Sequence, residues 1–190
     1  MTLATTKLVS EPFQYAYYFG PERESPRYAS RNVDETSTFE AVAKSIVNQA
    51  TDDGIGVVFV KEMSYYMKGR LHMLEEFFHN AKHSFLIRDP KKAIPSLYRV
   101  SENPDIHDWD YFDPSEAGFK ELYEMYEFVK EKLDPNPLVI DADDLLSSPK
   151  EMMKAYCEGV GIQYEDHMTS WKAGEQIGRA SCRERVSSPV

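Results

Sequence analysis

Arg88 and Ser96 carry the clearest chemical signal in the chain. Arg88 follows the apolar run 84–87, which is typical of a buried strand, and Asp89-Pro90 is a helix-start signal. In open α/β sheets, ligands bind beyond the carboxyl ends of the strands, where helix N-termini present free amides. A guanidinium at that edge and a hydroxyl eight residues later are suited to binding a phosphate. The alternative is that Arg88 pairs with a carboxylate and Ser96 is a neutral helix residue.

The elements that would position these residues alternate along the chain. Apolar or β-branched runs predict strands buried on both faces, as in a parallel sheet, at residues 55–60, 84–87 and 137–141. Apolar residues at helical spacing predict helices that begin near residues 37, 71, 90, 113 and 148. Strands separated by helices predict a three-layer α/β/α domain with a parallel sheet. Residues 11–32, rich in aromatics and proline, favour an ordered loop.

The two ends of the chain do not fit this pattern. Residues 1–10 contain no glycine and no strand of useful length. Residues 177–186 show neither helical periodicity nor strand alternation, and they resemble a sequencing-adapter sequence translated in one frame. We therefore expect an α/β domain at residues 1–176 and an artefactual, disordered tail at residues 177–190. A flexible basic tail is the alternative.

Composition and charge exclude several classes of protein. The 190 residues are 42% hydrophobic, and the apolar runs are far shorter than the ~20 residues of a membrane span, so we expect a folded domain without a membrane segment. The excess of 32 acidic over 22 basic residues disfavours nucleic acid as a partner. Cys157 and Cys182 suit neither a disulfide framework nor a zinc site, and the five histidines lack metal-ligand spacing. A cytoplasmic protein without a metal is expected, while the oligomeric state stays open.

Several motifs in a fixed order give the chain a resemblance to a known family. Arg88-x-Pro90 with Ser96 is similar to the 3′-phosphate-binding motif of sulfotransferases. Segments that resemble a branch of P-loop sulfotransferase-like proteins extend over residues 10–174, at Glu11-Pro-Phe13, Tyr17–Glu22, Val60-Lys-Glu-Met63 and residues 143–162. The resemblance implies a P-loop NTPase-like fold and sulfuryl transfer from 3′-phosphoadenosine 5′-phosphosulfate to a hydroxyl or amine of a small molecule or glycan. Arg88 and Ser96 would then bind the 3′-phosphate of this donor.

The resemblance also implies a 5′-phosphosulfate loop that this sequence does not contain. In related sulfotransferases, a loop with glycine and arginine or lysine follows the first strand and would precede Glu11, but residues 1–10 offer only Lys7. The family's late Arg-Lys-Gly donor-binding segment is missing too. We therefore expect a fragment that is incomplete at both ends and inactive as given, and an enzyme only at full length. For residues 1–10, a disordered leader on a degenerate protein is the alternative.

Glu11 and Lys61 are the expected catalytic residues. By resemblance to carbohydrate sulfotransferases, Glu11 would take the proton of the acceptor. Lys61 lies at a strand end, where many cytosolic sulfotransferases have a catalytic-loop lysine, but Met63 stands in place of their histidine. That difference removes the histidine mechanism from consideration. The alternatives are a helix cap or an ion-pair partner of a nearby arginine for Glu11, and an ordinary surface lysine for Lys61.

Two other functions compete with sulfuryl transfer. A non-catalytic nucleotide-binding or phosphate-binding scaffold of the P-loop superfamily would keep Arg88 and Ser96 for a phosphorylated ligand. A small kinase would share the parallel-sheet core, but it needs a GxxxxGK[ST] loop, which the sequence does not contain. Asp141, Asp143 and Asp144 are expected to form a helix-capping turn rather than a metal site.

Overall fold

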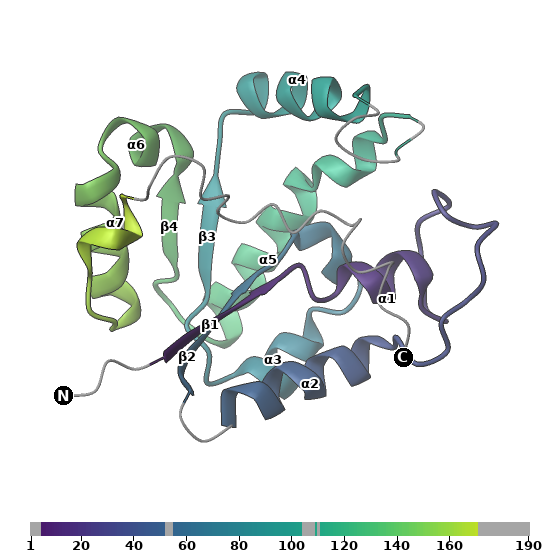
Figure 1. Ribbon diagram of the computed structural model, residues 1–190, viewed down its shortest axis with the longest axis horizontal. Helices are drawn as coiled ribbons and strands as arrows, with labels where there is room; N and C mark the ends of the chain where they lie inside the picture. The colour runs from purple at the N-terminus through teal and green to yellow at the C-terminus, as the bar shows by residue number, and fades with distance from the viewer. Residues whose placement is uncertain (1–4, 52–54, 104–108, 110, 171–190) are drawn as a thin grey trace. The chain divides into compact units, whose positions relative to one another are not determined.

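A computed structural model describes residues 5–51, 55–103, 109 and 111–170 (Figure 1). The chain divides into two compact units. Unit 1 comprises residues 1–79 and 118–125, and unit 2 comprises residues 80–117 and 126–190. Each unit holds a two-stranded parallel sheet with helices, which confirms the predicted α/β class and its parallel pairing.

Unit 1 is built on the parallel pair of β1 and β2, and α2 packs against both β2 and α3. Its elements, in chain order, are β1 (Thr5–Ser10), α1 (Gln14–Phe19), α2 (Phe39–Thr51), β2 (Ile55–Lys61), the 3₁₀ helix η1 (Ser64–Met67) and α3 (His72–Phe78). Two expectations were wrong here. Residues 5–10 do form a strand, because β2 supplies a partner for their backbone, and the expected loop at residues 11–32 contains the helix α1.

The core of unit 1 is aromatic. Tyr17, Tyr18, Tyr65 and Tyr66 are buried, with ring centroids 4.4–5.8 Å apart in mostly edge-to-face pairs. Such pairs contribute attraction beyond the area that they bury. Gly20 ends α1 where the chain passes close to other backbone, since a Cβ there would lie 2.2 Å from the carbonyl oxygen of Ser37. The packing therefore fixes α1 and η1 against each other.

Unit 2 is built on the parallel pair of β3 and β4, with α6 and α7 packed against β4. Its elements are β3 (Ser84–Ile87), α4 (Pro90–Ser101), the 3₁₀ helix η2 (Pro114–Ala117), β4 (Leu138–Asp141), α6 (Ala142–Ser147), α7 (Pro149–Val160) and the 3₁₀ helix η3 (Asp166–Met168). Helix α5 (Phe119–Lys132) belongs to unit 1 up to Met125 and to unit 2 from Tyr126.

Local signals placed several helix ends of unit 2 correctly. The Asp89 side chain accepts the amide hydrogen of Lys91 at 2.9 Å, as expected of a cap at the start of α4. Gly161 ends α7 in the left-handed conformation with φ of 77°. The capping signal at Asp113 begins only the short helix η2, and not the long helix that was expected there. The reason is Gly118, whose φ of 66° interrupts the helical conformation before α5 begins.

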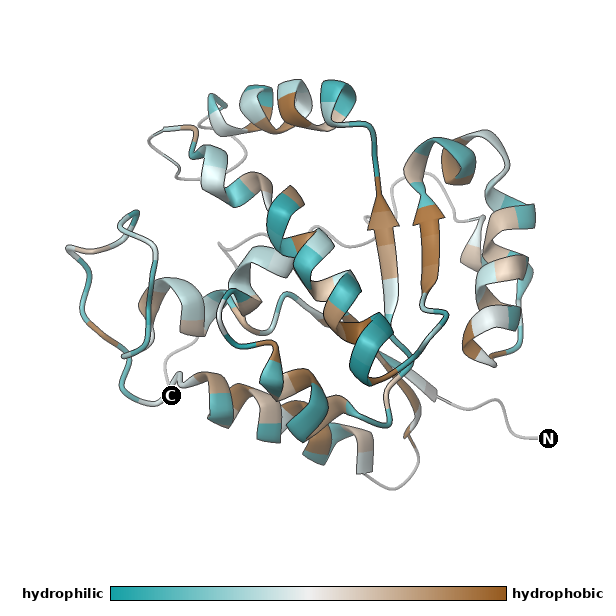
Figure 2. Cartoon of the chain, turned by 180° about the vertical axis from the view of Figure 1, so that it is seen from behind, coloured by the Kyte–Doolittle hydropathy of each residue, from teal (hydrophilic) through white to brown (hydrophobic). Residues whose placement is uncertain are grey.

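The strands are less buried than their apolar sequences predict. In β3 and β4 only Phe85 and Ile140 are buried, while Leu86 is 58% exposed and Val139 is 40% exposed. Figure 2 shows both strands as hydrophobic ribbons. In β2, Phe59 and Val60 are exposed as well. The prediction of strands buried on both faces was therefore wrong, because each strand has one sheet neighbour and helices cover only part of its surface.

Two further expectations concern the ends and the membrane. The predicted tail at residues 177–190 lies outside the described residues. Within the described part of the chain, none of the helices has the length and the apolar character that crossing a bilayer requires.

Candidate functional site

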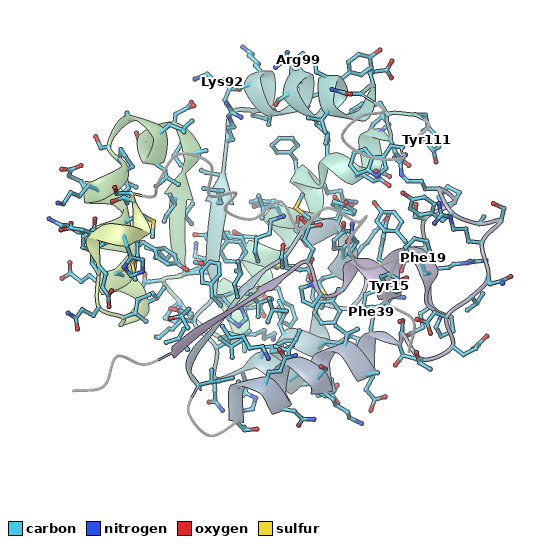
Figure 3. The ribbon with its side chains drawn as sticks, in the orientation of Figure 1. Tyr15, Phe19, Phe39, Lys92, Arg99 and Tyr111 are labelled. Atoms are coloured by element: carbon cyan, nitrogen blue, oxygen red, sulfur yellow. The ribbon has the colours of Figure 1, made fainter. Side chains whose placement is uncertain are left out.

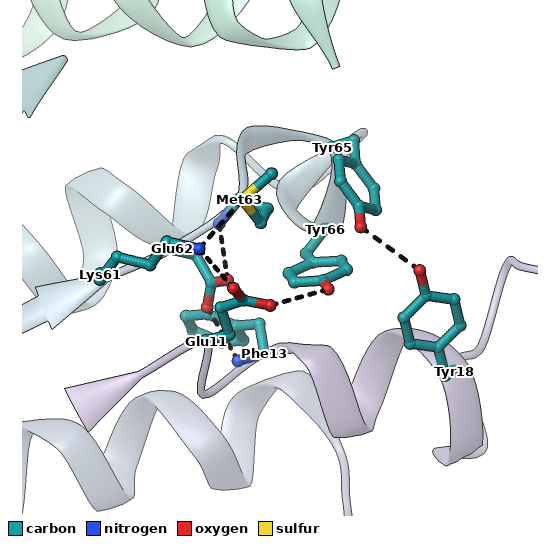
Figure 4. Close-up of polar contacts among 8 residues, drawn as sticks. All are labelled: Glu11, Phe13, Tyr18, Lys61, Glu62, Met63, Tyr65 and Tyr66. Atoms are coloured by element: carbon teal, nitrogen blue, oxygen red, sulfur yellow. Dashed lines mark hydrogen bonds and ion pairs between the residues drawn. The ribbon is translucent and has the colours of Figure 1, made fainter. Parts of the chain in front are cut away.

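In unit 1 the ends of two parallel strands bring Glu11 and Lys61 together. Ser10, the last residue of β1, lies opposite Lys61, the last residue of β2, and the amide of Glu11 donates to the Lys61 carbonyl at 2.7 Å. The Lys61 ammonium forms an ion pair with Oε1 of Glu11 (Figure 4). The two residues are 50 positions apart in the sequence, so the parallel register alone places them side by side.

The Glu11 carboxylate also accepts a second hydrogen bond, from a buried phenol. Tyr66 Oη donates to Oε2 of Glu11 at 3.2 Å, and Tyr66 is only 1% exposed. Burial raises the pKa of the Tyr66 phenol far above its ordinary value, with smaller contributions from Tyr65, Tyr18 and Glu11. The phenol therefore stays protonated and keeps its role as a donor, so each oxygen of Glu11 has a separate partner (Figure 4).

The backbone at Glu11 has an unusual conformation. Its φ is 47°, in the left-handed region that residues other than glycine rarely adopt. Such positions cost on the order of 1 kcal/mol or more, and they persist only where surrounding contacts hold them. The Glu11 carbonyl accepts the amide of Gln14 at 3.1 Å, which closes the turn into α1.

Glu62 supports this turn from the neighbouring strand end. Its Oε2 accepts the amide hydrogen of Phe13 at 2.9 Å, and its Oε1 accepts that of Met63 at 2.8 Å. Burial raises the pKa of the Glu62 carboxyl to about 8, and the nearby charge of Glu11 adds to the rise, while the two amides and Lys61 oppose it. We refer to Glu11, Lys61, Glu62 and Tyr66 as the Glu11 cluster.

Met63 lies two residues after Lys61, at the position where the sequence resemblance implies a histidine. Its sulfur lies 3.2 Å from the Lys61 ammonium. A thioether has no proton to give and is a weak acceptor, so Met63 contacts the lysine without taking part in proton transfer.

Arg88 lies in unit 2, directly after the end of β3. Its side chain is exposed, and within the described part of the chain it makes no hydrogen bond or ion pair. Helix α4 begins two residues later, so its first amides lie close to the same strand end. The alternative in which Arg88 is bound to a carboxylate therefore has no support among the described residues.

An ion pair of Lys92 connects the two helices that follow the strands of unit 2. Ile87 at the end of β3 lies opposite Asp141 at the end of β4, and each strand is followed by a helix. Lys92 on α4 forms an ion pair of 2.7 Å with Asp143 on α6, while Asp141 caps α6 through the Asp143 amide at 2.7 Å. The expected capping turn is thus confirmed, and the Lys92 ammonium is already paired with a carboxylate.

Ser96 lies on α4, eight residues after Arg88. It is six residues beyond Pro90, which corresponds to about 9 Å along the helix axis. Ser96 is partly exposed and lies four residues after Lys92 and three before Arg99, so it neighbours both on the surface of α4. Figure 3 labels Lys92 and Arg99 on this helix. The structure thus places both expected phosphate ligands in unit 2, on one strand–helix segment.

Two members of the Glu11 cluster were not identified from the sequence. Glu62 was quoted only as part of a motif, and Tyr66 received no role. The sequence signal for Glu62 was an acid next to the strand-end lysine, but no local pattern shows that it accepts an amide 49 residues away. Tyr66 reaches Glu11 only because η1 folds back after β2. Among the described residues, His, Cys, Asp and Glu form no group suited to a metal ion.

A family model matches most of the chain. The family model "Sulfotransferase domain" matches residues 5–181. "Branched-chain-amino-acid aminotransferase-like protein 1" of Arabidopsis thaliana is 30% identical over 136 residues, covering 71% of this chain and 22% of that protein. Protein 2 of the same name and plant is 30% identical over 104 residues, covering 55% and 17%. The solved "Sulfotransferase Domain from the Curacin Biosynthetic Pathway" aligns with a TM-score of 0.49 and 16% identity, covering 67% of this chain and 46% of that one. The chain spans about a fifth of the length of these curated relatives.

Proposed function

The chain belongs to the sulfotransferase family, and from that membership we propose that it transfers a sulfuryl group from 3′-phosphoadenosine 5′-phosphosulfate to a hydroxyl or amine. The acceptor is a small molecule or a glycan. In the reaction, the acceptor oxygen or nitrogen bonds to sulfur, the bond from sulfur to the phosphate oxygen breaks, and the acceptor loses one proton. The products are the sulfated acceptor and adenosine 3′,5′-bisphosphate.

The observation that carries the proposal is the arrangement around Glu11. Its side chain is 26% exposed, and its carboxylate is held at the ends of two parallel strands by Lys61 and Tyr66. An oriented carboxylate that can still reach solvent is suited to taking a proton from an acceptor. An ammonium beside it is suited to stabilising negative charge that develops on oxygen during transfer. The proposal therefore assigns Glu11 as the base and Lys61 as the stabilising cation.

The donor's 3′-phosphate is assigned to Arg88 and Ser96. The Arg88 guanidinium has no hydrogen bond or ion pair with any of the described residues, so a phosphate could offer it charge-assisted hydrogen bonds. The hydroxyl of Ser96 supplies a weaker donor on the helix that follows. Lys92 is paired with Asp143 and is therefore a poorer candidate for the same phosphate.

A binding experiment tests the donor assignment. Adenosine 3′,5′-bisphosphate and ATP are titrated separately against the protein, and the unfolding temperature is followed. We expect stabilisation by the bisphosphate, which Arg88→Ala strongly reduces and the control Arg99→Ala, on α4, retains. Preference for ATP, or an unchanged response in Arg88→Ala, contradicts the assignment.

The chain spans about a fifth of the length of its curated relatives, so transfer is measured on the protein as it occurs naturally, whatever its length. We propose that this protein acts in the cytoplasm, in line with Cys157, which is a buried free thiol. Bisphosphate binding without transfer to any acceptor would instead favour the non-catalytic phosphate-binding scaffold.

A further inference from the structure

The two hydrogen bonds of Glu62 connect the ends of both strands in unit 1. The Phe13 amide belongs to the turn that follows β1, and the Met63 amide belongs to the segment that follows β2. One carboxyl group therefore bridges two backbone segments that are about 50 residues apart in the sequence. The first of these segments is the one that carries Glu11.

The turn at Glu11 depends on contacts from outside itself. With φ of 47°, the backbone at Glu11 is in a conformation that a glutamate does not favour. The Glu11 amide is held by the Lys61 carbonyl, and the Glu11 carbonyl accepts from Gln14. Between these bonds, the Phe13 amide is held by the Glu62 carboxyl at 2.9 Å. Glu62 thus supplies a side-chain contact that fixes the backbone two residues after Glu11.

We propose that Glu62 is a positioning residue that fixes the turn carrying Glu11, and through that turn directs the Glu11 carboxylate toward the acceptor. Its catalytic consequence rests on the proposed sulfuryl transfer, whereas its effect on the turn does not. Glu62 does not take the acceptor's proton itself, because both of its oxygens are engaged by backbone amides.

The protonation of Glu62 gives this contact a measurable pH dependence. The groups that influence its charge are Glu11 from the turn after β1, Lys61 on its own strand end, and the amides of Phe13 and Met63. Its pKa of about 8 means that the ionised form gains population as the pH rises through that value. An ionised carboxylate offers strong acceptors on both oxygens, whereas the protonated form has one weaker acceptor. The hydrogen bonds from Glu62 to the two amides should therefore strengthen with rising pH, even though burial of the ionised carboxylate lowers the stability of the folded chain as a whole.

Nuclear magnetic resonance on the unmodified chain tests the contact without any assay of transfer. The carboxyl carbon of Glu62 and the amide protons of Phe13 and Met63 are followed from pH 6 to pH 10. We expect the three signals to shift with a common midpoint, and the Phe13 amide to exchange more slowly above that midpoint relative to free peptide. Independent titration of the carboxyl, with no response at the Phe13 amide, overturns the proposal.

Glu62→Gln provides the functional test, with Glu75→Gln on the exposed face of α3 as the matched control. Glutamine keeps one acceptor oxygen but places an NH₂ group against the other amide. In the full-length protein we expect Glu62→Gln to lower kcat at least tenfold with KM for the donor unchanged, and Glu75→Gln to leave both unchanged. Wild-type kcat in Glu62→Gln overturns the positioning role.

Two outcomes separate this inference from the proposed function. If the wild-type protein transfers no sulfuryl group but the Phe13 amide follows Glu62, the proposed function fails and the link between Glu62 and the turn stands. If Glu62→Gln does not fold, the wild-type pH profile decides. A rise of kcat with the Glu62 midpoint supports the positioning role, and a flat profile overturns it.

Discussion

The two groups of candidate residues lie at equivalent places but are prepared differently. Both follow the carboxyl ends of a parallel strand pair, the Glu11 cluster in unit 1 and Arg88 in unit 2. Glu11 is held by an ammonium, a buried phenol and a constrained turn. Arg88 is exposed and has no partner among the described residues.

The difference between the constrained Glu11 and the exposed Arg88 fits the roles proposed for them, a catalytic base and a phosphate ligand. A catalytic base must face the acceptor in one geometry. When its neighbours already hold it there, little free energy is spent on reorganising the site during the reaction. A guanidinium that binds a phosphate gains its charge-assisted bonds only when the ligand arrives. The Glu11 cluster is therefore expected to be sensitive to changes in its neighbours, and Arg88 chiefly to its own replacement.

The largest expected effect comes from Glu11→Gln in the full-length protein. The amide cannot take a proton, so kcat should fall by about 10²–10⁴-fold, the usual contribution of general acid–base catalysis. The affinity for adenosine 3′,5′-bisphosphate, measured by calorimetry, should stay the same. An unchanged kcat would remove Glu11 from proton transfer.

Replacement of Arg88 should have the next largest effect. Loss of a charge-assisted hydrogen bond is worth about 1.5–3 kcal/mol, so Arg88→Ala should weaken bisphosphate binding by about 10–100-fold. Lysine keeps the charge but not the planar fork, so Arg88→Lys should fall in between. Equal losses in Arg88→Ala and Arg99→Ala, measured by calorimetry, would contradict a specific phosphate contact and indicate only general charge.

The raised pKa of Glu62 predicts how stability depends on pH. Its pKa is about 8 in the folded chain against an ordinary value of 4.5, so the folded state binds the proton more tightly than the unfolded state. The contribution to the free energy of unfolding is therefore fully present below pH 4.5 and declines as the pH rises to about 8. The slope is at most about 1.4 kcal/mol per pH unit.

This slope can be isolated by comparing the denaturant unfolding of the wild type, Glu62→Gln and Glu75→Gln at several pH values. Glu62→Gln should flatten the decline between pH 5 and pH 8, while the control Glu75→Gln keeps it. A decline of equal size in all three proteins would assign it to other groups.

The smallest expected effect comes from Tyr66→Phe. The change removes the hydrogen bond to Glu11 but keeps the buried ring, so the free energy of unfolding should fall by about 0.5–1.5 kcal/mol. Tyr15→Phe on α1 is a matched control, since Tyr15 lies outside the Glu11 cluster. A loss no larger than that of the control would show that the phenol does not hold Glu11.

Much of the fold follows from local sequence signals. The runs that became β2, β3 and β4 were identified, as were the cap at Asp89 and the stop at Gly161. These features depend on a few neighbouring residues, which is why the sequence predicts them.

What the sequence could not show depends on contacts between distant residues. The segment Thr5–Ser10 is a strand because β2 lies beside it, although its own composition is an unremarkable mixture of polar and apolar residues. Glu11 and Lys61 were chosen by resemblance, yet the ion pair between them follows from parallel register. The role of Glu62 requires knowledge of which amide it meets, and no local pattern contains that information.

The most direct test of the central claim is the stoichiometry of the proposed reaction in the full-length protein. The protein is incubated with 3′-phosphoadenosine 5′-phosphosulfate and panels of hydroxyl and amine acceptors, and both products are quantified by mass spectrometry. The account predicts one adenosine 3′,5′-bisphosphate for each sulfated acceptor, with both products depending on Glu11. Bisphosphate release that is independent of any acceptor, or equal product formation by Glu11→Gln, would contradict it.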